Sequence, residues 1–155
     1  MTLEDVYALV GVQDIKALNN AYVREDQRLF KSGEWDYDNP ELLTNRIKKA
    51  LEEVDPRPLP LYERSWRREI LWFWYHHAIS CAIWRYKDRE MAKVYAAEAI
   101  VCQGRNHPNQ ITRLLFLLVN DRVEEARAWA AQIGDSVEQK TADELFLDYV
   151  SGRFF

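Results

Sequence analysis

Two stretches, DREMAKVYAAEA at residues 88–99 and RVEEARAWAAQI at residues 122–133, indicate the fold of this 155-residue chain. Each stretch begins with a polar turn and then carries small residues four positions apart, as at Ala92 and Ala96. This spacing places the small side chains on one face of a helix, where they allow a second helix to approach closely. Ala126 and Ala130 hold the same places in the second stretch, so the second half of the chain repeats a helical unit.

The repeat extends to the helix before each stretch, because Ile83 and Leu117 stand at matching positions ahead of the two turns. Each unit therefore reads as a helix, a tight turn and a second helix. Over about residues 75–133 this arrangement resembles the tetratricopeptide repeat family. The matching positions are Ser80, Ile83, Ala92, Ala96 and Ala99 in the first unit and Leu117, Ala126, Ala130 and Ile133 in the second.

The chain departs from that family pattern at several positions. Leu114 replaces a small residue. The family pattern also has an aromatic residue in the second helix at the position of Ala96 and Ala130, so an alanine replaces it in both units. The closing proline comes late in the first unit, at Pro108, and does not follow Ile133. An irregular helical bundle with alanine-lined contacts would give much the same pattern, so both architectures stay open. The resemblance implies a concave groove that binds a peptide or a protein, lined here by the fourth and sixth helices.

Apolar periodicity and capping residues predict about eight helices. Thr2 and Asp14 are expected to cap the first two helices, and Gly33 to end the second. Asn39-Pro40 is expected to open the third helix, and Ser136 with Gln139 to form a capping box for the eighth. No segment alternates polar and apolar residues, so no strand is expected, and the predicted class is all-α with stacked antiparallel helical hairpins. The expected helices cover about residues 3–10, 15–31, 40–54, 62–86, 88–103, 108–119, 123–133 and 136–149.

A proline-rich connector at residues 55–61 divides one predicted domain, residues 1–155, into an N-terminal part at 1–54 and a hairpin part at 62–155. Its prolines stand at alternate positions and favour extended backbone, which makes a stiff link. The hairpin part begins with the fourth helix, which is apolar nearly all round from Ile70 onward. A helix of this kind packs on several sides, so we expect it to be central.

Composition excludes several classes of protein. The hydrophobic fraction of 48% with 30% charged residues is typical of a folded domain rather than a disordered chain. The most apolar run, residues 70–84, is too short and too polar to span a bilayer, and the first residues lack the pattern of a secretory leader. Two cysteines give no disulfide framework, so we expect a cytoplasmic protein with no membrane partner.

The clearest candidate for partner binding is a short acidic stretch that also carries aromatic residues. Trp35 and Tyr37 alternate there with Asp36 and Asp38. Carboxylates beside aromatic rings suit a basic protein partner, although a solvated turn would have the same composition. The predicted partner-binding residues are Trp35, Asp36, Tyr37, Asp38, Trp66, Arg67 and Trp72.

The sequence offers one constellation for chemistry. His77 and Cys81 are four residues apart on a helix and could provide two metal ligands, or a thiol with its base. The neighbouring His76 points about 100° away, and His107 is the only other histidine. A histidine hydrogen-bonded within the core gives the same pattern. We therefore expect no catalytic residue, metal or cofactor, and keep a metal- or thiol-dependent enzyme centred on His77 and Cys81 as an alternative.

Two basic clusters raise the alternative of nucleic-acid binding. One surrounds Trp66 with Arg64, Arg67 and Arg68, and the other contains Arg85, Lys87 and Arg89. Arginines and an aromatic ring could contact phosphates and stack on bases. The net charge of −4 argues against it, because nucleic-acid binding usually requires a strong positive bias. The sequence thus favours a non-catalytic protein-binding module, either a helical-repeat adaptor or an inhibitor or immunity-type protein.

Overall fold

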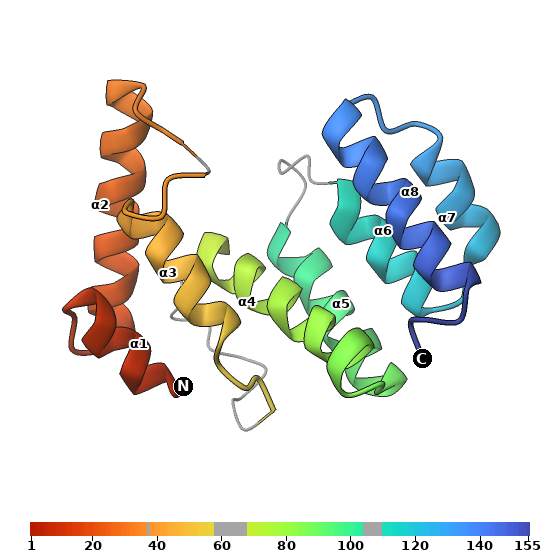
Figure 1. The fold of residues 1–155 in the computed structure, drawn as a ribbon, viewed down its shortest axis with the longest axis horizontal. Helices are drawn as coiled ribbons and strands as arrows, with labels where there is room; N and C mark the ends of the chain where they lie inside the picture. The colour runs from red at the N-terminus through yellow and green to blue at the C-terminus, as the bar shows by residue number, and fades with distance from the viewer. Residues whose placement is uncertain (37, 58–67, 104–109) are drawn as a thin grey trace. The chain divides into compact units, whose positions relative to one another are not determined.

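A computed structural model describes residues 1–36, 38–57, 68–103 and 110–155. These residues form eight α-helices, one short π-helix and no strand, which confirms the predicted all-α class (Figure 1). None of the described helices is long and apolar enough to cross a membrane. The elements are α1 Leu3–Val10, α2 Ile15–Ser32, α3 Leu43–Glu52, α4 Arg68–Ser80, η1 Cys81–Arg85, α5 Arg89–Gln103, α6 Gln110–Val119, α7 Val123–Ala130 and α8 Ser136–Val150.

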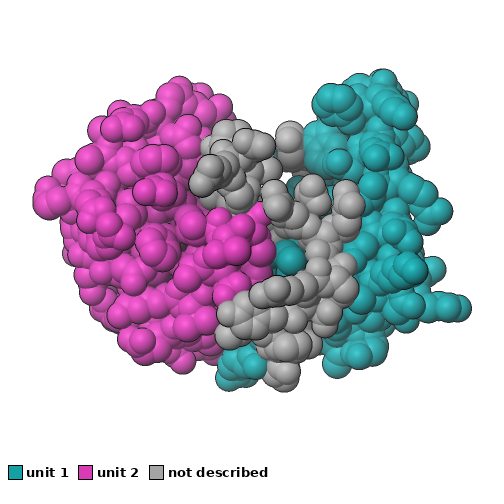
Figure 2. Space-filling view, turned by 180° about the vertical axis from the view of Figure 1, so that it is seen from behind, with its two compact units in different colours: residues 1–74 teal, residues 75–155 magenta. Residues whose placement is uncertain are grey.

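The helices group into two compact units, Met1–Trp74 and Tyr75–Phe155, which Figure 2 colours separately. The boundary between the units falls inside α4, so that Arg68–Trp74 belong to unit 1 and Tyr75–Ser80 to unit 2. The proline-rich connector is described only as far as Arg57.

In unit 1, α1, α2 and α3 pack against one another in pairs. Their apolar faces meet as the periodicity of the sequence predicts, and the core side chains are fully or almost fully buried. Removing these side chains from water provides the main stabilisation of such a bundle. The core of α1 to α3 contains Val6, Leu18, Leu29, Ile47 and Leu51.

Local capping forms the ends of α1 and α2 as expected. The Thr2 hydroxyl accepts from the Asp5 backbone N–H, and the Asp5 carboxylate accepts from the Thr2 N–H, which completes a capping box. Asp14 caps α2 by accepting from the Ala17 N–H at 2.8 Å. Gly33 ends that helix at φ 71°, a left-handed conformation that glycine adopts without a steric penalty.

The third helix begins later than the sequence suggested. α3 starts at Leu43, and Leu42 is its N-cap without a side-chain hydrogen bond. Asn39 does not cap it, because its side-chain oxygen accepts from the Glu41 N–H at 3.0 Å and forms a local turn instead. Residues that could have been helical therefore lengthen the loop before α3.

In unit 2 the helix with the most packed neighbours is α6, which packs against α5, α7 and α8. Among its ten residues, all of which the structure describes, only Arg113 is exposed. The fourth helix was expected to be central. Its Ala78 and Ile79 are indeed fully buried, but the core of unit 2 forms around α6.

The fourth helix was also expected to continue to Tyr86, but its α-helical part ends at Ser80. After Ser80 it widens into the π-helix η1, where the Tyr86 N–H donates to the Cys81 carbonyl at 2.8 Å. The Asp88 N–H then donates to the Ala82 carbonyl at 2.8 Å. Lys87 stands between them at φ 53°, so a left-handed residue reverses the chain into α5.

Several positions that the sequence periodicity aligns are buried in unit 2. Ala92, Ala96 and Ala126 are fully buried, and Ala130 is 6% exposed. Lys87 and Asp121, which the same alignment pairs, both adopt a positive φ, 53° and 57°. Other aligned positions differ, since Ser80 is exposed and Leu114 is fully buried.

The last helix and the C-terminal residues complete unit 2. Asp135 caps α8 by accepting from the backbone N–H groups of Val137 and Glu138, both at 2.9 Å, which corrects the prediction that Ser136 would be the cap. Beyond α8, Phe154 is 2% exposed. Its ring contacts Trp84 edge-on with 5.5 Å between centroids, so the C-terminal residues pack against the turn that follows α4.

Candidate functional site: the acidic segment

We call residues 34–41 the acidic segment. It contains Glu34, Asp36, Asp38 and Glu41 and no lysine or arginine, so its formal charge equals the net charge of −4 of the whole chain. The 21 acidic residues in the rest of the chain equal the basic residues in number. Within the acidic segment, Tyr37 is the one residue outside the described ones.

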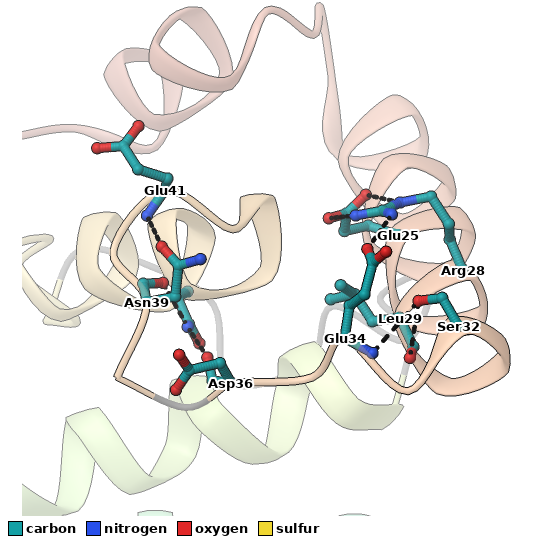
Figure 3. Close-up of polar contacts among 9 residues, drawn as sticks. Glu25, Arg28, Leu29, Ser32, Glu34, Asp36, Asn39 and Glu41 are labelled. Atoms are coloured by element: carbon teal, nitrogen blue, oxygen red, sulfur yellow. Dashed lines mark hydrogen bonds and ion pairs between the residues drawn. The ribbon is translucent and has the colours of Figure 1, made fainter.

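Hydrogen bonds from its own side chains fix the backbone of the acidic segment (Figure 3). The Asp38 N–H donates to the Asp36 carboxylate at 3.0 Å, and the Glu41 N–H donates to the Asn39 side-chain oxygen at 3.0 Å. The Asn39 N–H also donates to the Asp36 carbonyl at 3.3 Å. Two consecutive turns result, and they hold the carboxylates at set positions along the loop.

Asn45, in the first turn of α3, binds the acidic segment from outside. Its side-chain nitrogen donates to the carbonyl oxygen of Asp36 at 2.9 Å and to that of Asn39 at 2.7 Å. A primary amide carries two N–H donors, so it can make both bonds at once. The acidic segment is thereby tied to a helix of the unit 1 core.

The first carboxylate of the acidic segment is already paired. The Arg28 guanidinium lies between Glu25 and Glu34, at 3.0 Å from each, and Figure 3 shows the three side chains together. Hydrogen bonds to Glu25 and then to Glu34 raise the pKa of Arg28. Asp36, Asp38 and Glu41 are exposed and provide the negative charge that a partner would meet.

Trp35 is half-buried and faces a lysine of α3. The Lys48 ammonium lies 5.8 Å from the centre of the Trp35 ring and 4.2 Å from the centre of the Phe73 ring of α4. Cation–π attraction operates at such distances. Burial lowers the pKa of Lys48, while Glu52 and Asp26 act in the opposite direction. The acidic segment thus uses its tryptophan for packing and presents carboxylates outward.

The other predicted partner-binding residues are not placed. Tyr37, Trp66 and Arg67 lie outside the described residues, as does the side chain of Trp72. Sequence reasoning missed Asn45 and Lys48, which contact the acidic segment. Nothing in the sequence marks them, because a polar residue on a helix looks the same whether it contacts a loop or water.

The second candidate pair does come together. The Cys81 sulfur lies 3.6 Å from Nε2 and 3.8 Å from Nδ1 of His77, as their spacing on one helix face predicts. Among the described residues, no group of three or more His, Cys, Asp or Glu side chains could hold a metal ion. A two-residue contact between a thiol and an imidazole is what this location offers.

The adjacent histidine belongs to the interior of unit 2. Nε2 of His76 lies 2.6 Å from the hydroxyl oxygen of Thr112, a fully buried residue of α6. Burial lowers the pKa of His76 to about 4, so the imidazole is neutral at pH 7. The sequence raised a hydrogen-bonded core histidine as the alternative for His77; in the structure the neighbouring His76 makes such a hydrogen bond, and His77 contacts Cys81.

The second basic cluster makes internal contacts. Lys87 donates to the Arg153 carbonyl, and Arg89 pairs with Asp121. The Arg89 guanidinium also lies 4.7 Å from the centre of the Phe155 ring. These side chains join the turns of unit 2 to its C-terminal residues. The first cluster is not placed, because Arg64 and Arg67 lie outside the described residues and the side chain of Arg68 is not described.

The groove implied by the family resemblance would require exposed side chains on α6. Arg113, its one exposed residue, lies with its guanidinium 5.0 Å from the centre of the Trp129 ring of α7. The remaining residues of α6 are buried or partly buried. Arg113 is therefore the one exposed side chain that α6 could present to a partner, and it already stacks on Trp129 of α7.

The acidic segment remains the best-supported candidate site. Exposed carboxylates on a fixed loop can accept hydrogen bonds from lysine and arginine and can attract a basic surface at a distance. Comparison of the chain with protein-family models, with curated proteins and with solved structures gave no match.

Proposed function

We propose that this chain is a protein-binding module that acts by surface complementarity, and that its acidic segment binds a basic segment of a partner protein. One observation carries the proposal. Four carboxylates and no basic residue lie in a single loop whose backbone is tied down by Asn45, and Asp36, Asp38 and Glu41 remain exposed.

A fixed loop favours binding for an entropic reason. A flexible loop must be ordered on association, which costs about 0.5–1.5 kcal/mol for each rotamer-rich side chain that becomes immobile. Here the hydrogen bonds of Asp36, Asn39 and Asn45 already order the backbone. Three carboxylates of one sign also steer a basic partner and disfavour an acidic one, so they contribute to specificity and association rate.

The helical hairpins of unit 2 fit the role of a scaffold. The resemblance to tetratricopeptide repeats suggests an adaptor, and it is supported by the burial of both Ala92 and Ala126 and by the positive φ of both Lys87 and Asp121. An inhibitor or immunity-type protein would use the same surface chemistry. Both are binding functions that involve no turnover.

The decisive variant is Asp36→Asn with Asp38→Asn and Glu41→Gln. It removes three charges while keeping an acceptor oxygen at each position, including the one that Asp38 N–H uses on residue 36. The control replaces three exposed carboxylates of other helices, Glu4, Glu124 and Glu144, by glutamine. Both proteins then differ from the wild type by the same net charge.

The measurement is affinity capture from lysate followed by titration of each captured partner. We expect wild type and control to retain a partner with a lysine- or arginine-rich segment, and the acidic-segment variant to bind it at least about tenfold more weakly, equivalent to about 1.4 kcal/mol. Equal retention by all three proteins would remove the acidic segment from the function.

A metal- or thiol-dependent enzyme is the second candidate, because the Cys81 sulfur and the His77 imidazole are 3.6 Å apart. A metal would need further ligands from residues outside the described ones or from solvent. Metal analysis of protein purified without an affinity tag tests it. Near-stoichiometric zinc or copper that is lost in Cys81→Ser would favour this candidate over the binding module.

A further inference from the structure

We propose that Lys48 is the positioning residue of the acidic segment, and that its positive charge holds Trp35 against α3 and α4. This inference rests on the proposed function, because it explains how the partner-binding loop is kept in place. It goes further by assigning the control of that loop to one side chain that carries charge.

The geometry places two attachment points on one side of α3. Asn45 and Lys48 are three residues apart, so they are neighbours on the helix surface. Asn45 holds the carbonyl groups of Asp36 and Asn39. Lys48 contacts the ring of Trp35, the residue before Asp36. The acidic segment is therefore attached through its backbone in the middle and through an aromatic ring near its start.

The second aromatic contact makes the charge of Lys48 important. Its ammonium lies 4.2 Å from the centre of the Phe73 ring and 5.8 Å from that of Trp35, so it is close to a ring of α4 and to a ring of the loop. Attraction to the faces of aromatic rings requires a cation, and partial desolvation strengthens it. A neutral chain of the same length would keep the apolar contact of its methylene groups and lose the electrostatic one.

Burial and nearby carboxylates act in opposite directions on the charge of Lys48. Asp26 of α2 and Glu52 of α3 both favour the ammonium form, against burial, which disfavours it. The lysine thus lies where α2, α3, α4 and the acidic segment meet within unit 1. Any neutralisation of Nζ, by substitution or by acylation, would weaken the attachment of Trp35 while leaving Asn45 in place.

Hydrogen–deuterium exchange of the free full-length protein tests the positioning role. The variants are Lys48→Met, which removes the charge and keeps a long side chain, and Lys48→Arg, which keeps the charge. Lys49→Met is the matched control, because Lys49 is exposed on the same helix and its loss changes the net charge equally. Exchange is followed in peptides covering residues 34–38 and, as an internal reference, in peptides from the core of α3.

We expect Lys48→Met to accelerate exchange at residues 34–38 about three- to tenfold relative to the α3 reference, as the strength of a partly desolvated cation–π contact implies. Lys48→Arg and Lys49→Met should stay within about twofold of the wild type, since each leaves a cation at position 48. Unchanged exchange in Lys48→Met overturns the proposal. Equal acceleration in Lys48→Met and Lys48→Arg overturns the part played by charge.

If Lys48→Met lowers the stability of the whole of unit 1, Lys48→Gln serves as a second neutral variant. Its exchange at residues 34–38 is again compared with exchange in the α3 reference peptides. A second measurement separates this proposal from the proposed function. Binding of a short peptide of alternating lysine and serine is measured by fluorescence anisotropy at low salt. We expect Lys48→Met to bind about threefold more weakly than Lys49→Met, which carries the same charge. Accelerated exchange with no peptide binding by the wild type would overturn the proposed function and leave the positioning role standing.

Discussion

The side-chain nitrogen of Asn45 lies 2.7 Å from the carbonyl oxygen of Asn39, and this bond joins α3 to the loop that precedes it. The same nitrogen donates to Asp36, so one amide fixes both ends of a turn that carries two exposed carboxylates. The order of the acidic segment therefore depends on a residue outside it.

Asn45→Ala tests that dependence. Each hydrogen bond contributes about 0.5–1.5 kcal/mol net, so the unfolding free energy should fall by about 1–2 kcal/mol in urea denaturation. Exchange at residues 36–41 should rise as well. Asn45→Asp is the informative control, because it keeps the shape and cannot donate, and it should behave like the alanine variant. Wild-type stability in both variants would show that the two bonds do not hold the loop.

Thr44→Val should stabilise the protein. The Thr44 hydroxyl is fully buried in α3 and makes no hydrogen bond with any described residue. A buried hydroxyl without a partner costs about 1–3 kcal/mol, and valine replaces it with a methyl group of similar size. We expect a gain of about 1 kcal/mol in the unfolding free energy. Thr44→Ser, which keeps the hydroxyl and loses the methyl group, should lose about 1 kcal/mol. A loss in both variants would indicate a hydrogen-bond partner for Thr44.

His76 predicts a specific pH dependence. Burial lowers its pKa to about 4 in the folded protein, against 6.5 in the unfolded chain. As pH falls the unfolded chain takes up the proton first, so stability is greatest above pH 6.5, decreases between 6.5 and 4, and changes no further below 4 from this group. The decrease from pH 7 to pH 5 should be about 1–2 kcal/mol.

The measurement is urea denaturation of the wild type and of His76→Gln at both pH values. Glutamine can still hydrogen-bond to the Thr112 hydroxyl and does not titrate, so the variant should lose that share of the pH dependence. An identical decrease in both proteins would assign it to other groups.

Asp121 joins three parts of unit 2. It adopts φ 57° in the turn between α6 and α7, pairs with Arg89 of α5 and accepts from the Tyr149 hydroxyl of α8 at 2.6 Å. Asp121→Ala should cost about 2 kcal/mol, from the left-handed conformation and the lost acceptors. Asp121→Asn tolerates that conformation and keeps one acceptor, so it should cost about half as much. Equal thermal unfolding of the two variants would contradict this account.

The tyrosine reports on the same contact. The hydrogen bond to Asp121, followed by burial, raises the pKa of Tyr149 above its ordinary value of 10.0. In Asp121→Asn the pKa should move back toward that value, because the carboxylate no longer disfavours the tyrosinate. Titration of ¹³C-labelled tyrosine by NMR measures it, and an unchanged pKa would mean that Asp121 does not govern this hydroxyl.

Features that depend on near neighbours in the chain could be predicted from the sequence alone. Thr2, Asp14 and Gly33 begin and end their helices as predicted, because capping involves groups within a few residues. The sequence also aligns Lys87 with Asp121, and both residues adopt a positive φ. It also located the acidic segment and brought His77 next to Cys81, since spacing on one helix fixes both.

The contacts that these local features make with other elements depend on the tertiary fold. The Asn39 side chain could cap a helix or close a turn. It accepts from the Glu41 N–H and closes a turn, while the Asn39 carbonyl accepts from the Asn45 side chain. Trp35 could be an exposed contact residue; in the structure it is half-buried, and its ring faces Lys48 of α3. Such contacts join separate elements of the fold, as between Trp35 of the loop and Lys48 of α3, and they leave no periodic signal in the sequence.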